Sequence, residues 1–170
     1  EIKWGEQTTT DDRQGEIIDI SKNIPSKKII QKGLINFVGN IMQKPPKVSA
    51  VKIRGKRAYQ RFRNNEVFET KQRLVKVYSL KLIDQSHDKI SKFRIECGKG
   101  FYVRSLVRDI CKKLNVDGHV IKLKRNESEP FNIKNSISIK DFLKLYEKND
   151  WKNFLLPIYS VLNKIKYVGK

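Results

Sequence analysis

Residues 97–109 read Cys-Gly-Lys-Gly-Phe-Tyr-Val-Arg-Ser-Leu-Val-Arg-Asp. Alternating apolar residues lead up to Cys97, two glycines then flank a lysine, and apolar residues follow at helical spacing from Val103 to Leu114. Glycines permit positive φ and a close approach of the backbone, and the first amides of a helix offer a site for an anion. The stretch therefore predicts a strand, a tight turn with binding potential, and a helix packed on a sheet.

Two side chains of this stretch, Tyr102 and Arg104, are candidates for a functional site. If the backbone is still extended there, a spacing of two places both on one face and turns Val103 towards the core. An aromatic ring beside a guanidinium suits a flipped nucleobase on the ring and a fork that reaches a carboxylate or phosphate. Tyr-x-Arg is also common as a plain surface pair, so both interpretations stay open on these residues alone.

On either side of this stretch, the pattern predicts an α+β fold with a mixed, largely antiparallel sheet and flanking helices. Strands are expected at the N-terminus up to Trp4, at 16–20, at 49–53, at 73–83 with a bulge, at 90–97, and at 119–123. Helices are expected between Pro25 and Gly39, over 58–63, over 102–114 and after Ser138, where Ser138 and Asp141 form a capping pattern. Cys97 and Cys111 are expected as small core residues, and neither they nor the two histidines form a metal-binding pattern.

Basic residues are in large excess over acidic ones. The 170 residues include 37 Lys and Arg against 18 Asp and Glu, for a net charge of +19. Such an excess concentrates polyanions at the surface and speeds their capture. An AT-rich genome would also favour lysine codons, but it would enrich Glu as well, so nucleic acid is the expected partner. No apolar stretch of about 20 residues could span a membrane and no signal peptide is visible, so a cytoplasmic location is expected.

A second group of residues, between 45 and 59, could grip phosphates. The segment 45–52 reads Pro-Pro-Lys-Val-Ser-Ala-Val-Lys, and a turn around Gly55 then carries three basic residues. A rigid Pro-Pro elbow that supports a strand is the alternative, and both roles can hold together. The candidate RNA contacts in this and neighbouring segments are Lys52, Arg54, Lys56, Arg57, Lys99 and Arg125.

Two further segments contain residues that could belong to a functional site. In 119–125, alternation along a strand places Leu123 on the face of His119 and Arg125, either as core filler or as the apolar wall of a base pocket. Asp11 and Asp12 invite a search for a catalytic acid pair. Adjacent acids point apart in an extended chain, so this loop is expected to cap a turn instead.

Taken together and in order, these segments resemble the tRNA pseudouridine synthase B family. The likeness covers most of the chain, and the combination of Pro-Pro-x-x-Ser-Ala-x-Lys with Lys-Gly-x-Tyr-x-Arg is highly specific. The matching segments are Trp4-Gly5, Thr10-Asp11, Gly15-Glu16, 39–43, 45–52, 55–59, 99–109 and 118–125. The resemblance implies part of the pseudouridine synthase fold, no cofactor, and conversion of the T-loop uridine of tRNA into pseudouridine.

The resemblance also implies roles for three residues. Tyr102 matches the active-site tyrosine that contacts the base, Arg104 the arginine that ion-pairs with the catalytic aspartate, and Leu123 a leucine of the substrate pocket. In that family the aspartate attacks the nucleotide, and the base detaches, turns and rejoins through carbon. An arginine fork would keep such a carboxylate ionised and aimed in a dry pocket.

Departures from the family pattern shape the remaining expectations. The family's aspartate lies in a loop like Gly-x-x-Asp-x-x-Ala-x-Gly, which is not found here and is expected ahead of Glu1, so this chain alone is expected to be inactive. Residues 1–154 are expected as the C-terminal part of the catalytic domain, and 155–170 as the lead-in to an RNA-binding domain that is otherwise absent. A monomer that acts on the T-stem-loop of tRNA is expected. A non-catalytic tRNA-binding or tRNA-folding module is the alternative.

Overall fold

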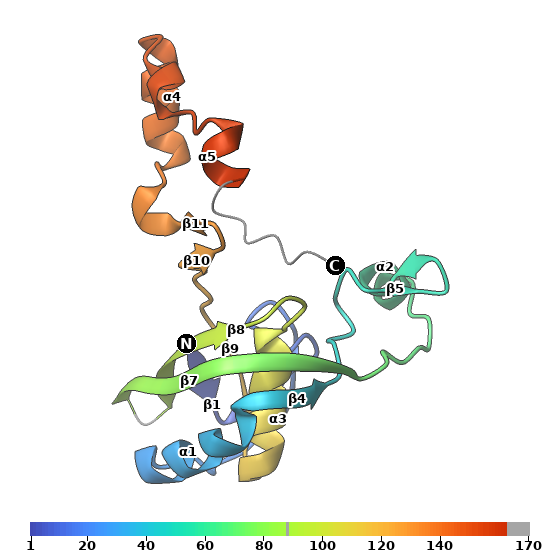
Figure 1. The fold of residues 1–170 in the computed structure, drawn as a ribbon. Helices are drawn as coiled ribbons and strands as arrows, with labels where there is room; N and C mark the ends of the chain where they lie inside the picture. The colour runs from blue at the N-terminus through green and yellow to red at the C-terminus, as the bar shows by residue number, and fades with distance from the viewer. Residues whose placement is uncertain (88, 163–170) are drawn as a thin grey trace. The chain divides into compact units, whose positions relative to one another are not determined.

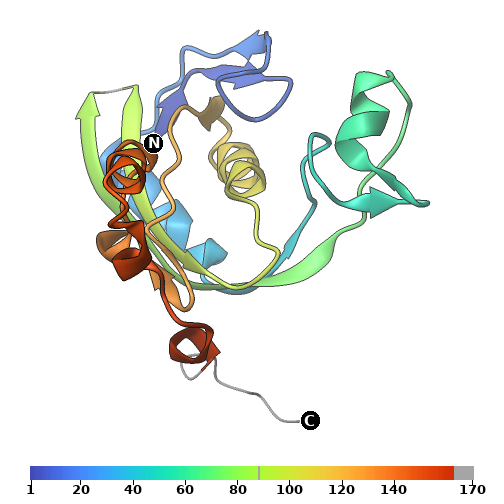
Figure 2. The same ribbon diagram turned by 90° about the horizontal axis from the view of Figure 1, so that it is seen from above.

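A five-stranded antiparallel sheet, in the order β4-β7-β8-β1-β9, organises the first 123 residues (Figure 1). The strands are Gly39–Gln43 (β4), Arg73–His87 (β7), Ile90–Cys97 (β8), Ile2–Trp4 (β1) and Gly118–Val120 (β9). Helices α1 (Lys27–Leu34) and α3 (Val103–Leu114) pack on the sheet, and Figure 2 shows α3 within its curve. This computed structural model describes residues 1–87 and 89–162. The predicted α+β fold with a largely antiparallel sheet is confirmed.

The core lies between the sheet and the two helices. Trp4 is fully buried, its Nε1 donates a 2.8 Å hydrogen bond to Ser91 Oγ, and its ring meets that of Phe93 edge-on with centroids 6.3 Å apart. A Cβ on Gly118 would lie 2.9 Å from Cys111 Sγ and 3.0 Å from Trp4, so only glycine allows this packing. The remaining buried members of the core are Ile2, Ile30, Leu34, Val77, Leu80, Leu106, Val107, Ile110 and Val120.

The long hairpin of β7 and β8 is the frame on which the site is built. Its register shifts between Val77 and Ser79, which confirms the predicted bulge and keeps both Val77 and Leu80 buried. Strand β4 pairs with the first half of β7, and this pairing sets Gln43 directly opposite Arg73. Strand β4 was not predicted, because its sequence has neither clear alternation nor β-branched enrichment.

Smaller hairpins project from this frame. Strands β2 (Glu6–Thr8) and β3 (Ile17–Ile20) form one, and β5 (Lys52–Ile53) and β6 (Lys56–Arg57) form another. The second hairpin turns at Arg54 and Gly55, whose φ angles are 48° and 82°, as a type I′ turn requires at both positions. The predicted helix follows it as α2 (Ala58–Arg63).

Residues 124–170 form a second unit. It contains β10 (Glu127–Ser128), β11 (Phe131–Asn132), α4 (Ile139–Glu147) and α5 (Ile158–Leu162), with 3-10 turns at Ile133–Asn135 and Trp151–Phe154. Ser138 Oγ accepts a hydrogen bond from the Asp141 amide, which confirms the predicted cap. The proposed functional boundary after residue 154 stays a prediction, and residues 163–170 of the expected lead-in lie outside the described residues. In the part of the chain that the structure describes, every helix is too short or too polar to cross a membrane.

The two cysteines differ in environment. Cys111 is buried in the core as predicted. The prediction for Cys97 is wrong, because Cys97 is the last residue of β8 and is exposed where the chain leaves the core.

Candidate active site

Tyr102 and Arg104 both lie at the start of α3, but their backbones differ. Tyr102 is the extended residue that precedes the helix, with φ −118° and ψ 115°, and the helix begins at Val103. Arg104 is therefore helical, so the backbone is extended at Tyr102 but not at Arg104, and the condition for a spacing of two to place both side chains on one face is not met. Tyr102 is the N-cap of α3 and Arg104 lies in its first turn, so both belong to the same end of the helix. Each side chain is held by its own set of contacts.

Tyr102 is held from two strands. Gln43 Oε1 accepts a 2.8 Å hydrogen bond from the Tyr102 amide, and Gln43 Nε2 donates at 3.1 Å to the Tyr102 carbonyl. The guanidinium carbon of Arg73 lies 5.1 Å from the centroid of the Tyr102 ring, within the range of a cation–π contact. Sequence reasoning missed both partners, because neither is near Tyr102 in the chain.

Arg104 is the centre of a hydrogen-bonded ion pair. Its Nη1 donates to Asp12 Oδ2 at 3.0 Å and to the Thr10 carbonyl at 3.2 Å, while Nη2 donates to the Val48 carbonyl at 2.7 Å. The Arg104 and Asp12 side chains are each 22% exposed. Among the described residues, the acid that pairs with Arg104 is thus Asp12.

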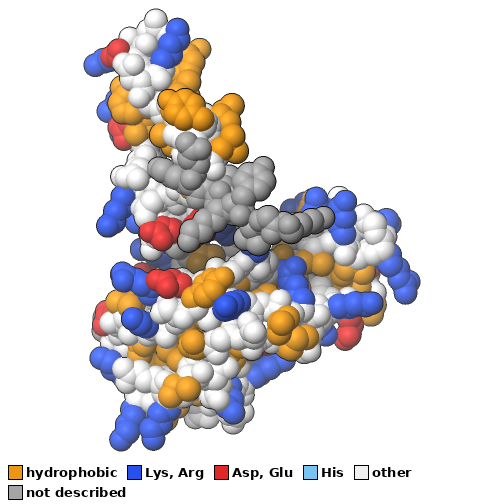
Figure 3. All heavy atoms as spheres, in the orientation of Figure 1, with side chains coloured by type: hydrophobic (Ala, Val, Ile, Leu, Met, Phe, Trp, Pro, Cys, Tyr) orange, Lys and Arg blue, Asp and Glu red, His pale blue; other side chains and the backbone are white. Residues whose placement is uncertain are grey.

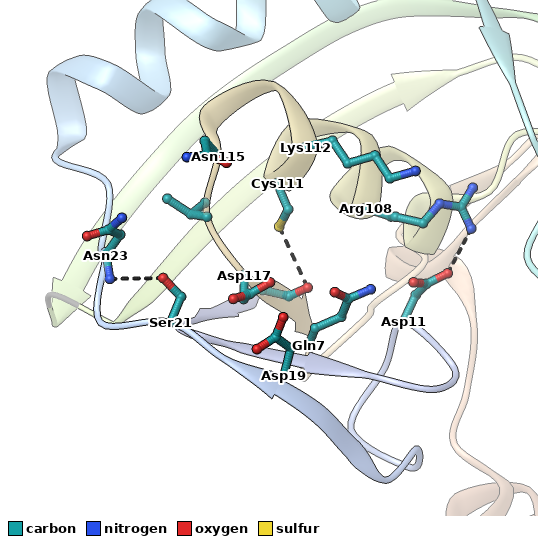
Figure 4. A pocket seen from close by; sticks show the side chains of 12 residues that line it. Gln7, Asp11, Asp19, Ser21, Asn23, Arg108, Cys111, Lys112, Asn115 and Asp117 are labelled. Carbon is teal, nitrogen blue, oxygen red and sulfur yellow. Dashed lines mark hydrogen bonds and ion pairs between the residues drawn. The ribbon is translucent and has the colours of Figure 1, made fainter.

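Arg108 repeats this arrangement one helical turn further on. Its Nη1 lies 3.0 Å from Asp11 Oδ2, as Figure 4 shows, and its Nη2 donates to the Lys44 carbonyl at 2.6 Å. Asp11 has a φ of 61°, and the two consecutive acids reach consecutive turns of one helix. The spacing of four between Arg104 and Arg108 places both on one helix face. This spacing is the only sequence feature that could have indicated that the two arginines pair with two consecutive acids.

Asp12 also shapes its own loop. Its Oδ1 accepts hydrogen bonds from the Gln14 amide at 3.0 Å and from Thr10 Oγ1 at 2.7 Å. The expectation that this loop caps a turn is therefore confirmed, in addition to the ion pairs that it did not foresee. The loop is positioned twice, by its own turn and by α3.

Burial acts on the carboxylates around Arg108. It raises the pKa of Asp11 above its ordinary value, although the Arg108 guanidinium opposes this shift. Burial likewise raises the pKa of Asp109, whose Oδ1 lies 3.7 Å from Arg108 Nε. Arg108 thus offsets part of the cost of burying both carboxylates.

The Pro-Pro segment serves as an elbow beside α3. Pro45 and Pro46 are buried, and the Pro45 carbonyl accepts a 2.7 Å hydrogen bond from Thr70 Oγ1. The Lys44 carbonyl accepts a 2.7 Å hydrogen bond from Ser105 Oγ in addition to the one from Arg108. Ser49 Oγ is buried and has no partner among the described residues. Residues 44–49 therefore form an elbow that supports the start of α3. The basic turn at Arg54 and Gly55 follows this elbow in the chain and is exposed.

The predicted RNA contacts in the first unit are exposed, and Figure 3 shows basic side chains gathered around the β5–β6 hairpin and α2. Arg57 Nη1 donates to the Ala50 carbonyl at 2.7 Å, and Lys56 Nζ lies 3.9 Å from Glu66. A cavity of about 370 Å³ beside Lys56 is lined by Lys56, Gln60, Arg63 and Asn64. The exposed residues are Lys52, Arg54, Lys56, Arg57 and Lys99.

Two candidates near the end of the first unit lie differently from expectation. The strand that was expected to carry Leu123 ends at Val120, and Leu123 is 64% exposed. The predicted alternation of side chains over 119–125 is therefore wrong, because the strand ends at Val120, three residues before Leu123. Arg125 is exposed and belongs to the second unit.

Asp11 and Arg108 also form part of the wall of a polar cavity of about 360 Å³ (Figure 4). Burial and the nearby Asp19 raise the pKa of Asp117 in its wall. None of the predicted site residues lines it. The lining residues are Gln7, Asp11, Asp19, Ser21, Asn23, Arg108, Cys111, Lys112, Asn115, Val116, Asp117 and Gly118.

In residues 1–87 and 89–162, no three His, Cys, Asp or Glu side chains gather as a metal site would require.

Comparison with known families identifies the family and the fold. The family model for the TruB family pseudouridylate synthase (N terminal domain) matches residues 1–103. The chain belongs to the TruB family. The model of the tRNA pseudouridylate synthase B C-terminal domain matches residues 104–163, so the two TruB models together cover nearly all of the chain.

Curated TruB relatives show the same similarity. The tRNA pseudouridine synthase B of Ehrlichia ruminantium (strain Gardel) is 40% identical over 168 residues, which are 98% of this chain and 57% of that protein. The proteins of the same name from Prochlorococcus marinus (strain AS9601) and Caulobacter vibrioides are 42% and 37% identical over 97% and 96% of this chain. The chain spans about half the length of these TruB relatives, 54% and 53% in the latter two.

Solved structures share the fold. The structure titled "Crystal Structure of a Cbf5-Nop10-Gar1 Complex" matches with a TM-score of 0.64 at 22% identity, over 96% of this chain and 43% of that chain. The structure titled "Structure of H/ACA RNP bound to a substrate RNA containing 2'-deoxyuridine" matches with a TM-score of 0.56 at 19% identity, over 93% and 36%. At these identities the likeness concerns the TruB fold alone.

Proposed function

We propose that this chain is part of an enzyme that isomerises the T-loop uridine of tRNA to pseudouridine. The observation that carries the proposal is the start of α3, where a TruB-family chain presents a tyrosine beside an arginine held in an ion pair. Tyr102 would contact the flipped base by its ring, and Arg104 would orient the nucleophilic aspartate. The reaction uses no cofactor and takes place in the cytoplasm.

Arg104 has donors left for a second carboxylate. Its known hydrogen bonds use two N–H groups of Nη1 and one of Nη2, and within the described residues none involves Nε. A guanidinium has five donors in a rigid fork, so two remain for the nucleophile. That aspartate belongs to the family loop that is not found in these 170 residues, and this chain alone is proposed to be inactive.

The basic surface would bind the T-stem-loop. The exposed basic residues of the β5–β6 hairpin and Lys99 would bind phosphates. Arg125, in the second unit, is a further proposed RNA contact. Leu123, exposed at the end of the first unit, would cover the base. We assign residues 1–154 to the catalytic domain and 155–170 to the lead-in of an RNA-binding domain, and we propose that the protein acts as a monomer.

The experiment is a chimera that supplies the nucleophile. A segment with the Gly-x-x-Asp-x-x-Ala-x-Gly loop, taken from a TruB relative, is fused ahead of Glu1 and incubated with tRNA that carries tritium at carbon 5 of its uridines. We expect tritium release from the T-loop position, since isomerisation breaks that carbon–hydrogen bond. The matched control replaces the aspartate of the fused loop by asparagine and should release none.

Two results would contradict the proposal. Release by the 170-residue chain without the fused loop would show that the nucleophile lies within it. Tight binding of the T-stem-loop by a chimera that releases no tritium would favour a non-catalytic tRNA-binding or tRNA-folding module.

A further inference from the structure

Gln43 and Arg73 face each other across β4 and β7 and both reach Tyr102. They are direct register partners, and side chains of opposed residues in an antiparallel pair project from the same face of the sheet. Gln43 contacts the Tyr102 backbone, and Arg73 contacts the Tyr102 ring. One pair of opposed residues in the sheet thus contacts both the backbone and the ring of Tyr102.

The contact of Gln43 is a reciprocal amide clamp. Only 1% of Gln43 is exposed, and its carboxamide accepts from the Tyr102 amide while donating to the Tyr102 carbonyl. A neutral side chain needs both an acceptor and a donor in one plane to do this, and among uncharged side chains the carboxamide offers them. The clamp gives the Tyr102 amide an acceptor, and it adds a second donor to the Tyr102 carbonyl, which also accepts a 3.1 Å hydrogen bond from the Leu106 amide of α3.

The contact of Arg73 covers one face of the ring. Its guanidinium carbon lies 5.1 Å from the ring centroid, and its Nη2 donates to the Gly100 carbonyl. Gly100 has a φ of 77°, a backbone conformation that favours glycine, and it places the turn within van der Waals distance of the Arg73 guanidinium. With Arg73 over one ring face, a base that stacks on Tyr102 would use the opposite face.

We propose that Gln43 and Arg73 are positioning residues that fix the backbone and the ring plane of Tyr102 for the proposed isomerisation. They act through Tyr102 rather than on the RNA. This inference rests on the proposed function of Tyr102 for its catalytic consequence, while the contacts themselves can be tested without it.

The first experiment tests the ring contact without catalysis. The 170-residue chain is labelled with 3-fluorotyrosine, and the fluorine resonances of Tyr102 and Tyr78 are assigned by replacing each with phenylalanine. Arg73→Met removes the cation and keeps the length of the stem, so the Tyr102 resonance should shift and the Tyr78 resonance should stay. Lys76→Met is the matched control, because Lys76 lies on the same strand with Nζ 5.2 Å from the Tyr78 ring. It should move Tyr78 only. An unmoved Tyr102 resonance in Arg73→Met overturns the proposal.

The second experiment tests the catalytic consequence in the chimera with the aspartate loop. Arg73→Met should lower the single-turnover rate at saturating T-stem-loop RNA about tenfold, with a Kd change no larger than that of Lys76→Met. Arg73→Lys keeps the charge without the fork and should recover part of the rate. A loss confined to Kd would mean that Arg73 is only an RNA contact, and would overturn the proposal.

Gln43 is tested by Gln43→Glu, which keeps the acceptor for the Tyr102 amide and loses the donor to its carbonyl. The rate at saturating RNA should fall while Kd stays within twofold, and an unchanged rate in a folded variant would overturn the role of Gln43. If this buried variant does not fold, Arg73→Met still decides the role of the opposed pair. If the unsubstituted chimera is inactive, the proposed function fails, and the fluorine resonances still decide whether Arg73 orients the ring.

Discussion

Asp12 Oδ2 lies 3.0 Å from Arg104 Nη1, although the two residues are 92 positions apart in the chain. With the parallel contact between Asp11 and Arg108, it fastens the loop after β2 to two successive turns of α3. This loop is consequently part of the candidate site, and the ion pairs can be tested by stability as well as by activity.

Replacing Asp12 by asparagine should destabilise the fold by about 1.5–3 kcal/mol, since a charged hydrogen bond in a largely buried position is lost. In a double-mutant cycle with Arg104→Met, the combined loss should fall short of the sum of the single losses by more than about 0.5 kcal/mol. Urea unfolding measures both. Glu16→Gln, an exposed acid of the same hairpin, should change stability by less than about 0.5 kcal/mol. Additive losses would mean that the pair contributes nothing as a pair.

Tyr102→Phe should separate rate from affinity in the chimera. The hydroxyl is lost while the ring and its stacking face remain, so the Kd for the T-stem-loop should change less than twofold. The rate at saturating RNA should fall at least tenfold, which single-turnover tritium release measures. Tyr59→Phe, on α2 with its ring 5.7 Å from the Arg63 guanidinium, provides a control away from the start of α3. Equal effects of the two substitutions would remove Tyr102 from the proposed site.

Binding of the T-stem-loop should weaken steeply with salt. If the basic surface contacts about six phosphates, the logarithm of the binding constant should fall with the logarithm of salt concentration at a slope between about −4 and −5. Lys56→Ala should reduce the steepness by about one and weaken binding at every salt concentration. Fluorescence anisotropy with labelled RNA gives both numbers. A slope near zero would show that the excess of basic residues plays no part in binding.

Ser91→Ala should cost about 1–3 kcal/mol, because it leaves the buried indole N–H of Trp4 without its acceptor. Thermal unfolding followed by the tryptophan signal measures this loss. In a Trp4→Phe background the donor is gone, so the same substitution should cost much less. Ser79→Ala, on the neighbouring strand β7, is the matched control and should be nearly neutral. An equal cost in both backgrounds would assign the loss to packing instead.

The thiols should differ in reactivity at pH 8. Burial, with Asp117 and Asp11 nearby, raises the pKa of Cys111 to about 12, while Cys97 is exposed. A thiol reagent should therefore modify Cys97 quickly and Cys111 only after unfolding. Because the folded state keeps the Cys111 proton above the unfolded pKa of about 8.5, stability should fall as pH rises from there towards 12. Cys111→Ala should show a smaller fall, and identical slopes would contradict the shift.

Much of the fold could be predicted where local signals act alone. The helix at 58–63, the cap at Ser138 and the strand 90–97 follow from turn chemistry, capping and alternation, and all three are present. The strand 39–43 could not be predicted, because its own sequence has little strand character and its pairing with β7 decides its conformation. Leu123 was placed on a strand that ends at Val120, since alternation in sequence does not say where hydrogen bonding stops.

The candidate site likewise consists of residues that a local motif predicted and of partners that it did not. Tyr102 and Arg104 stand out in one local motif, and the motif lies at the start of α3 as expected. Their partners Gln43, Arg73 and Asp12 come from segments 29 to 92 residues away, by the differences in residue number. Such segments come together only in the folded chain, so these contacts could not be predicted from a single sequence.

The direct opposition of Gln43 and Arg73 has a consequence for changes of chain length. A deletion of one residue between Arg73 and the bulge at Val77 would turn the Arg73 side chain to the other face of the sheet and away from Tyr102. The same deletion near the β7–β8 turn would leave this end of the strand as it is. TruB relatives should therefore differ in length at the far end of this hairpin, while the four-residue interval from the arginine to the bulge stays constant.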